Sequence, residues 1–380
     1  MKILHVITGV AKKDGGTSEV TPRLCRALKE AGHDVTLAAL RVDELSNSAR
    51  AAIAAGVIYK DFPRSRFLTN RLGLSSAFRR GIVELVRSAD IVHLHGLWEA
   101  PGWYAAAECC RQKKPYVMMT HGFLEPERLK ISKWKKRIAA FCFDRRNLKA
   151  AKAIVATSES EAQGIRQYGL TNPIHIMPIG LDLEPFLPSV PHEQKTLLYF
   201  SRITPIKGLD MLAEAWARLA HEVKNQGGGG QRWKLLLVGP DDRGYTEEMK
   251  KLYAAKCPPG SYEFRGPVFG AEKYKLLASV DAMVLPTRSE NWSIAVAEGM
   301  AAGLPVVCTK GAPWPCLGEN WVDISVAGIE AGLRRILSAS DEERAAIGAV
   351  NRQWVKDNLS WSSIVNAMTE CYVSVLSAND

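Results

Sequence analysis

The sequence lacks the short motifs of several common protein classes. Its eight cysteines form no C-x-x-C pair, its eight histidines occur in no H-E-x-x-H element, and there is no convincing Asp-x-Asp pair. A zinc or other metal site is therefore not expected. The G-x-G-x-x-G spacing of a dinucleotide fingerprint is also missing, which argues against a nicotinamide enzyme.

Long apolar runs are missing as well. No window approaches the roughly 20 uninterrupted apolar residues that a membrane-spanning helix needs. The opening MKILHVITG is too short for the apolar region of a signal peptide and has no small-residue cleavage site. We therefore expect a cytoplasmic protein with reduced cysteines.

Acidic residues are scarce only in the first half of the chain. The net charge is +10, and residues 1–180 carry 29 Lys and Arg against 16 Asp and Glu, whereas residues 181–380 carry 21 against 24. The densest basic run lies on an expected helix with Trp134, Phe141 and Phe143 interleaved. It comprises Lys130, Lys133, Lys135, Lys136, Arg137, Arg145, Arg146, Lys149 and Lys152. This face would suit anionic lipid headgroups, or it is an ordinary solvated helix face; nucleic acid is a weaker choice because no binding motif accompanies it.

What the sequence does contain is a regular alternation of strand-like and helical segments. The 380 residues suit two domains, and the alternation predicts an α/β protein with two Rossmann-like domains facing each other across a cleft. Strands are expected at 3–7, 35–40, 91–94, 116–119 and 154–156, then at 196–200, 234–238, 262–265, 281–285 and 306–308. Helices are expected at 18–30, 75–88, 101–112, 133–150 and 159–167, then at 209–223, 246–255, 271–278, 293–302, 327–338 and 341–357. Five prolines within 173–191 should interrupt regular structure and form the hinge, and 227–230 should be a flexible loop inside the second domain.

Two loops are candidates for binding phosphate, and each follows the first strand of an expected domain. Gly15 and Gly16 lie between the first strand and a helix, where backbone N–H groups attract phosphate, although ordinary turns use such pairs too. Arg202 and Lys207 follow the strand that opens the second domain, and two cations there suit a diphosphate. The alternative for them is a surface loop with two solvated charges.

Two glutamates stand near the start of an expected helix in SENWSIAVAEGMAAGLPVV. A ligand across the helix start could reach both Glu290 and Glu298, and carboxylates bind vicinal hydroxyls well. Stabilisation by the helix dipole could explain Glu290 but not Glu298. The small residues after Glu298 should pack against another element.

Three histidines lie in or after strands of the first half. His93 is expected in the core, whereas His95 and His121 come at strand ends. Gly122 follows His121, so we expect the His121 ring to be exposed at the ligand crevice. No metal-ligand spacing accompanies them.

Taken in order, these features resemble glycosyltransferase family four, whose members have the GT-B fold and generally retain anomeric configuration. The most specific match is the pair Glu290 and Glu298 in a segment ending at Val306. Supporting matches are Gly15–Gly16, Gly32–His33–Asp34–Val35, Gly180–Leu181–Asp182 with Phe186, and Arg202 with Lys207.

The resemblance implies roles for these residues. Arg202 and Lys207 would hold the donor diphosphate, with Gly15 and Gly16 beside it. Glu298 would bind the ribose hydroxyls and Glu290 those of the transferred sugar, with Asn291, Trp292 and Ser293 also at the donor. His121 would lie near the reacting carbon. No cofactor or metal is implied, and the donor is a nucleotide diphosphate-sugar.

The resemblance also implies a domain plan and an acceptor. Residues 1–178 would form the acceptor-side domain, 179–360 the nucleotide-sugar domain, and 361–380 a helix returning to the first domain. The segment from His121 through Glu125 and Pro126 into the basic helix resembles a subset that builds bacterial envelope polysaccharides on lipid carriers. The acceptor would be a saccharide, lipid-linked in that subset, at the inner face of the cytoplasmic membrane.

Some positions depart from the family pattern. Trp292–Ser293 replaces a common Phe-Gly, Thr309–Trp314 replaces a Gly-Gly loop, and Ile179 replaces a frequent asparagine. These departures bear on donor identity more than on reaction class. A GT-B-like epimerase or phosphorylase and a non-enzymatic two-lobed sugar-binding protein remain as alternatives.

Overall fold

The chain folds into two α/β units. The computed structural model describes residues 1–11, 16–65, 72–124, 144–184, 186–187, 190, 194–225 and 233–378. Unit 1 comprises Met1–Gly180 with Trp361–Asp380, and unit 2 comprises Leu181–Ser360. Several predicted features lie outside the described residues: Gly15, Glu125, Pro126, the 227–230 loop and the basic run as far as residue 143. Among the described residues, no helix combines the length and apolar character needed to cross a bilayer.

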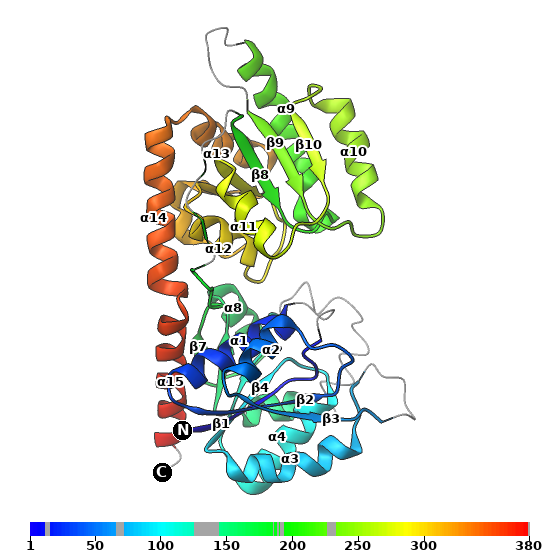
Figure 1. Cartoon of the computed structure of the whole chain (residues 1–380), viewed down its shortest axis with the longest axis vertical. Coiled ribbons are helices and arrows are strands. Elements are labelled where there is room, and N and C mark those ends of the chain that lie inside the picture. Colours follow the sequence, from blue (N-terminus) through cyan, green and yellow to red (C-terminus); the bar gives the residue numbers. More distant parts are fainter. Residues whose placement is uncertain are drawn as a thin grey trace. The chain divides into compact units, whose positions relative to one another are not determined.

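Unit 1 is built on a seven-stranded parallel sheet in the order β3-β2-β1-β4-β5-β6-β7 (Figure 1). Its strands are β1 (Lys2–Val6), β2 (Asp34–Leu40), β3 (Ile58–Phe62), β4 (Ile91–His95), β5 (Tyr116–Met119), β6 (Ala153–Ala156) and β7 (Ile174–Ile176).

The sequence prediction missed both edge strands of this sheet. β3 carries Lys60 and Asp61 and has no fully buried residue, so its apolar pattern is weak. The prediction that the 173–191 segment has no regular element was wrong, because β7 forms there between Pro173 and Pro178. Three residues are too few for periodicity to reveal a strand.

Helices cover both faces of this sheet. On one face α1 (Thr17–Glu30), α2 (Asn47–Ala54) and α15 (Trp361–Ser377) contribute to one hydrophobic core. On the other, α3 (Ser76–Ser88), α4 (Ala100–Gln112), α7 (Arg145–Ala150) and α8 (Glu159–Gln167) contribute to a second. The short α2 was also missed by the sequence prediction.

The C-terminal helix α15 packs on unit 1. Its apolar side chains recur at helical spacing and are buried in the same core as β1 and α1: Ile364, Val365, Met368, Tyr372 and Val375. At its start, Trp361 lies against Gly180 so closely that a Cβ on that glycine would be 2.6 Å from the indole ring. Residues distant in sequence therefore complete the core of this unit.

Unit 2 repeats the architecture with a six-stranded parallel sheet in the order β10-β9-β8-β11-β12-β13. Its strands are β8 (Thr196–Phe200), β9 (Lys234–Val238), β10 (Tyr262–Arg265), β11 (Ala282–Leu285), β12 (Val306–Thr309) and β13 (Trp321–Val322). Its helices are η2 (Pro205–Lys207), α9 (Leu209–Asn225), α10 (Tyr245–Lys256), α11 (Ala271–Ala278), α12 (Ile294–Ala301), η3 (Pro315–Asn320), α13 (Val326–Ser338) and α14 (Asp341–Leu359).

Both sheets reverse their strand order beside the first strand of the unit. The reversal lies between β1 and β4 in unit 1 and between β8 and β11 in unit 2. Open α/β sheets bind ligands outside the carboxyl ends of the strands at such switch points. The loops after β1, β4, β8 and β11 are therefore the places to look for a site.

Candidate active site

In unit 2, the loops after β8, β11 and β12 are locked together by their backbones. Gly208, at φ 69°, approaches β11 so closely that a Cβ there would lie 2.1 Å from the Pro286 carbonyl oxygen. A Cβ on Gly311 would likewise lie 2.1 Å from the carbonyl oxygen of Thr287. The backbone N–H of Glu290 donates to the Gly311 carbonyl at 2.7 Å. These three loops thus form one rigid platform at the switch point.

On this platform Lys207 forms an ion pair with Glu290. Lys207 is only 5% exposed, and Glu290 keeps a quarter of its side chain accessible. Burial and the nearby positive charge of Arg202 lower the pKa of Lys207 to about 8, whereas the Glu290 carboxylate favours the charged ammonium. The structure therefore pairs Lys207, which the resemblance assigned to the donor diphosphate, with Glu290, which it assigned to the transferred sugar.

Arg202 lies in the same loop as Lys207, with an exposed side chain. Its backbone carbonyl accepts a 2.6 Å hydrogen bond from the buried Tyr199 hydroxyl, which anchors the turn after β8. The guanidinium is thus accessible to a ligand, while the loop that carries it is fixed.

The segment before α12 contains an unusual backbone and an aromatic contact. Ser293, at the helix N-cap, has φ 66° and is buried. The rings of Trp292 and Trp314 lie 4.5 Å apart, and the Trp314 indole N–H donates to the Trp292 carbonyl at 2.5 Å. The two departures from the family pattern therefore contact each other. Within the described part of the chain, the buried indole N–H of Trp292 has no acceptor.

Glu298 lies on α12, buried, and its Oε1 accepts from Lys273 Nζ of α11 at 2.5 Å. The small residues that follow are packed, as expected. A Cβ on Gly299 would lie 2.5 Å from the Met283 sulfur, and one on Gly348 of α14 would lie 1.8 Å from the Gly303 carbonyl oxygen. Close packing against β11 and α14 therefore fixes the helix that carries Glu298.

In unit 1, His121 follows β5 with φ 50° and is only 7% exposed. The expectation of an exposed ring was wrong, because the ring turns toward His95 and its Nε2 lies 3.1 Å from His95 Nδ1. Glu161 of α8 holds this turn, since its Oε1 accepts from the Thr120 hydroxyl at 2.6 Å and the Gly122 N–H at 2.5 Å.

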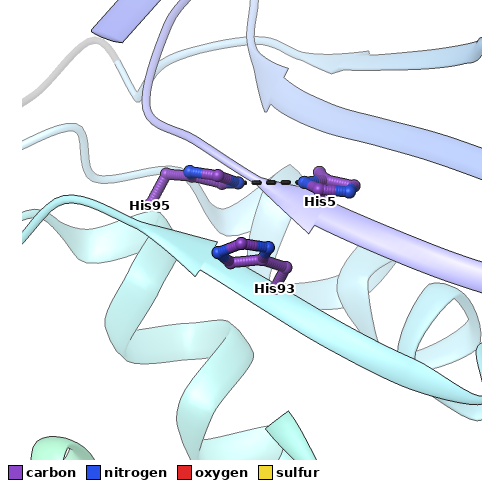
Figure 2. A group of neighbouring side chains, drawn as sticks. All are labelled: His5, His93 and His95. Atoms are coloured by element: carbon purple, nitrogen blue, oxygen red, sulfur yellow. Dashed lines mark hydrogen bonds between the residues drawn. The ribbon is translucent and has the colours of Figure 1, made fainter. Parts of the chain in front are cut away.

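Three histidines gather at the switch point of this unit: His5, His93 and His95 (Figure 2). His5 and His93 are direct neighbours in the β1–β4 register, and His95 follows two residues later on the same face. All three are buried, and one ring nitrogen from each lies within 4.8 Å of the others. His93 Nδ1 is also hydrogen-bonded to the Tyr372 hydroxyl of α15 at 2.7 Å. His93 is thus a core residue, as predicted.

Sequence reasoning missed three residues: His5 and Lys273, which contact His95 and Glu298, and Glu161, which holds the turn that carries His121. The i, i+2 spacing of His93 and His95 indicated that both side chains lie on the same face of the sheet. His5 pairs with His93 in the neighbouring strand and lies on that face too, so the sequence did contain a sign of the cluster. Glu161 is an acidic residue and Lys273 a basic residue, each in an ordinary amphipathic helix. Nothing in the sequence distinguished them from solvated charges.

Two models of known protein families match this chain. The family model described as Glycosyltransferase Family 4 matches residues 14–185, and the one described as Glycosyl transferases group 1 matches residues 194–337. Together they span most of both units. The chain belongs to glycosyltransferase family four. It is therefore an enzyme that transfers glycosyl groups, and the prediction of family and reaction class is confirmed.

Relatives in this family act on different acceptors. The chain is 23% identical over 356 residues to the GDP-mannose:cellobiosyl-diphosphopolyprenol alpha-mannosyltransferase of Xanthomonas oryzae pv. oryzae, covering 91% of this chain and 87% of the relative. It is 24% identical over 331 residues to the D-inositol 3-phosphate glycosyltransferase of Xylanimonas cellulosilytica, covering 79% and 76%.

Solved structures confirm the GT-B fold. HepE of Anabaena, determined in complex with UDP and glucose, superimposes with a TM-score of 0.73 at 17% identity over 98% of this chain and 100% of that one. The sucrose-phosphate synthase of Thermosynechococcus elongatus gives 0.71 at 16% identity over 100% of both chains. At these identities the likeness establishes the fold, with its two Rossmann-like units.

Proposed function

We propose that this glycosyltransferase moves a sugar from a nucleotide diphosphate-sugar to a saccharide acceptor with retention of anomeric configuration. The observation that carries the proposal is the buried Lys207 paired with Glu290 at the switch point of unit 2, with the exposed Arg202 in the same loop. A buried cation beside an accessible one suits a diphosphate whose negative charge grows as it leaves.

The other donor contacts follow from the same platform. Glu290 is shared between Lys207 and the hydroxyls of the transferred sugar, which its accessible quarter can reach. Glu298 binds the ribose hydroxyls and is oriented by Lys273. The N–H of Trp292, with Asn291 and Ser293 beside it, offers a further polar contact at the start of α12. Gly16, which precedes α1 at φ 34°, and Gly15 supply backbone near the diphosphate.

In the reaction, the bond between the anomeric carbon and the β-phosphate oxygen breaks, and a bond from that carbon to an acceptor hydroxyl oxygen forms. The nucleoside diphosphate departs with the electron pair, and the proton of the acceptor hydroxyl passes to an oxygen of the departing diphosphate. Arg202 and Lys207 stabilise the departing charge, so the proposed transfer is metal-independent. His121, held by Glu161, lies near the reacting carbon.

The acceptor we propose is a lipid-linked saccharide, in the synthesis of an envelope polysaccharide or lipopolysaccharide. Two observations support this. The Xanthomonas relative is named for a diphosphopolyprenol acceptor, and Arg145, Arg146, Lys149 and Lys152 are exposed around α7 whereas Leu148 is buried. This basic face would bring the enzyme to the anionic inner face of the cytoplasmic membrane as a peripheral protein.

The first experiment is a thermal-shift screen against UDP, GDP and their sugars, because a ligand that binds the native state raises apparent stability. The stabilising donor is then incubated with polyprenyl-diphosphate-linked disaccharides, with and without chelator. Elongated product with unchanged anomeric configuration, formed in chelator, is the expected result. Sugar conversion with donor alone would instead indicate an epimerase, and full loss of turnover in chelator would contradict metal independence.

A further inference from the structure

Three imidazole rings form a continuous hydrogen-bonded chain in unit 1. His5 Nδ1 lies 2.9 Å from His95 Nε2, and His95 Nδ1 lies 3.1 Å from His121 Nε2. Figure 2 shows the rings of His5 and His95 end to end, with the bond joining their facing nitrogens, while His93 lies against them. The chain runs from the interior of the sheet to the residue that the proposed function places beside the reacting carbon.

The geometry suits protons between the rings better than a metal ion. A tetrahedral ion at about 2.0 Å from each nitrogen would hold two ligand nitrogens roughly 3.3 Å apart, farther than the 2.9 Å between His5 and His95. The His93 and His95 rings are stacked, with centroids 4.2 Å apart and planes at 21°. Lone pairs of stacked rings lie in separate, nearly parallel planes and do not converge on one point.

Each buried ring of this cluster is neutral. Burial lowers the pKa of His5 to about 3, and burial together with the neighbouring histidines lowers the pKa values of His93 and His95 well below their usual range. A neutral imidazole has one N–H and one acceptor nitrogen. Because both nitrogens of His95 face another histidine, it must donate to one and accept from the other. The chain therefore has a direction.

The far end of the chain decides that direction. If the bonds ran from His121 to His5, the proton of His5 would sit on Nε2, which is buried and has no partner among the residues that the structure describes. An orphaned buried N–H is rarer in native structures than an unused acceptor. The favoured direction is thus His5 to His95 to His121, with His121 accepting at Nε2.

We propose that His5 and His95 are positioning residues that fix His121 in the tautomer with its proton on Nδ1. In that form His121 offers a hydrogen-bond donor at Nδ1, while its acceptor nitrogen is engaged by His95. It can donate to an oxygen of the transferred sugar but cannot take the proton of the acceptor hydroxyl. The tautomer follows from the cluster alone; the contact with sugar rests on the proposed function.

The test is a two-bond ¹H–¹⁵N correlation spectrum of the full chain labelled with [¹⁵N]histidine, in which the two neutral tautomers give different nitrogen shifts. The His121 signals are assigned by their loss in His121→Gln. We expect the Nδ1-protonated pattern in the unmodified enzyme. In His95→Leu the Nε2-protonated form should appear, and in His95→Asn, whose amide N–H lies near the position of Nδ1, the original pattern should persist.

Kinetics provide a second readout. One lost hydrogen bond of ordinary strength corresponds to a change of about 5- to 10-fold, so kcat of His95→Leu should fall by about that factor with little change in KM for the donor. His95→Asn should recover most of it. Tyr372→Phe is the matched control, because the Tyr372 hydroxyl contacts His93 but none of the three hydrogen-bonded histidines. It should leave both the His121 tautomer and kcat unchanged. If His95→Leu does not fold, His95→Gln is the second variant: its amide lies near the position of Nε2, so it can keep the contact with His5 but not the one with His121, and it should give the same spectral change.

The outcomes separate this inference from the proposed function. A Nδ1-protonated His121 in an enzyme without nucleotide-sugar activity would support the chain and reject the proposed function. An Nε2-protonated or charged His121 in the unmodified enzyme, or a tautomer unchanged in His95→Leu, would overturn the inference even if transfer is observed. One equivalent of zinc, retained on purification and lost in His93→Gln, would overturn it as well.

Discussion

The hydroxyl of Tyr372 lies 2.7 Å from Nδ1 of His93, a hydrogen bond that joins residues 279 positions apart in the chain. Both residues are fully buried. The bond fastens the C-terminal helix α15 to the central strand β4, beside the histidine cluster. Together with the buried apolar side chains of α15, it ties the last segment of the chain into the core of unit 1.

Removing this hydroxyl should destabilise the fold without affecting transfer. Tyr372→Phe leaves His93 Nδ1 without its partner, which costs about 1–3 kcal/mol for a buried polar group. Urea unfolding followed by tryptophan fluorescence measures the loss. Tyr372→Ala should cost more, about 3–5 kcal/mol, because it also opens a cavity. Equal stability of Tyr372→Phe and the unmodified chain would show that the bond contributes nothing.

The sequence predicted the fold well because the information needed was local. Continuous apolar strands and amphipathic helices alternate strongly enough that ten of the strands could be placed, and the switch points follow from their order. The elements missed were the short or exposed ones, β3, β7, β13 and α2, in which two to eight residues offer too little periodicity. Strand-end positions for Arg202, Lys207 and Glu290 followed from the same pattern.

Side-chain partners were harder to predict. The spacing of Glu290 and Glu298 in the sequence revealed neither the Lys207 contact nor the Lys273 contact, since both join different elements. His121 was expected to be exposed because a glycine follows it. Instead, its positive φ and the carboxylate of Glu161 turn the ring inward. Such outcomes depend on tertiary packing that single-sequence patterns do not encode.

The cations of the platform should affect turnover more than donor binding. Leaving-group charge grows in the transition state, so Arg202→Ala and Lys207→Ala should each lower kcat about 100-fold or more. Glu298→Ala should act mainly on KM for the donor, because ribose is held equally in ground and transition states. Glu290→Ala and His121→Ala should fall between. Lys250→Ala, an exposed lysine on α10, is the control, and near-normal kcat in both cation variants would reject this site.

Membrane association should depend on the basic face around α7. Each basic residue near an anionic surface contributes about 1 kcal/mol, so Arg145→Gln, Arg146→Gln and Lys149→Gln together should weaken vesicle binding roughly a hundredfold. Flotation with phosphatidylglycerol vesicles at low and high salt measures the effect, and neutral vesicles should bind little. The matched control removes three exposed lysines of α10, Lys250, Lys251 and Lys256, to glutamine. Equal loss in both triple variants would contradict a specific surface.

Asp144 should make unit 1 less stable as the pH rises. Burial raises its pKa to about 6, although Oδ1 accepts from the Trp98 N–H at 3.2 Å and the Trp103 indole at 3.0 Å. The folded state therefore holds this proton more tightly than the unfolded state. Its stabilising effect is complete below the unfolded pKa near 4 and is lost as the pH rises through about 6.

Replacing Asp144 by asparagine should remove that dependence. Asn keeps an oxygen for both donors and carries no charge, so Asp144→Asn should be more stable by up to about 3 kcal/mol at pH 8, and by about half of that at pH 5. Urea unfolding at the two pH values tests this. Asp90→Asn, an exposed carboxylate of the same unit, serves as the control. A gain that is equal at both values would exclude ionisation as the cause.

The final prediction concerns the pH dependence of transfer, which should follow the protonation of Lys207. Its pKa in the ligand-free enzyme, lowered by burial to about 8, predicts that kcat/KM for the donor declines as the pH rises through 8, because the neutral amine no longer stabilises the departing diphosphate. The Glu290 carboxylate favours the charged form. Glu290→Gln removes that charge and should shift the decline to lower pH, whereas Glu290→Asp should shift it less.

The measurement is kcat/KM for the donor against pH from 6 to 10 with saturating acceptor, on variants whose unfolding temperatures are compared first. Lys207→Arg supplies the decisive comparison, because a guanidinium stays charged over the whole range. If Lys207 causes the decline, the residual activity of Lys207→Arg should be flat between pH 7 and 9. A decline near pH 8 that survives in Lys207→Arg would assign the titration to another group, such as the acceptor or the nucleotide.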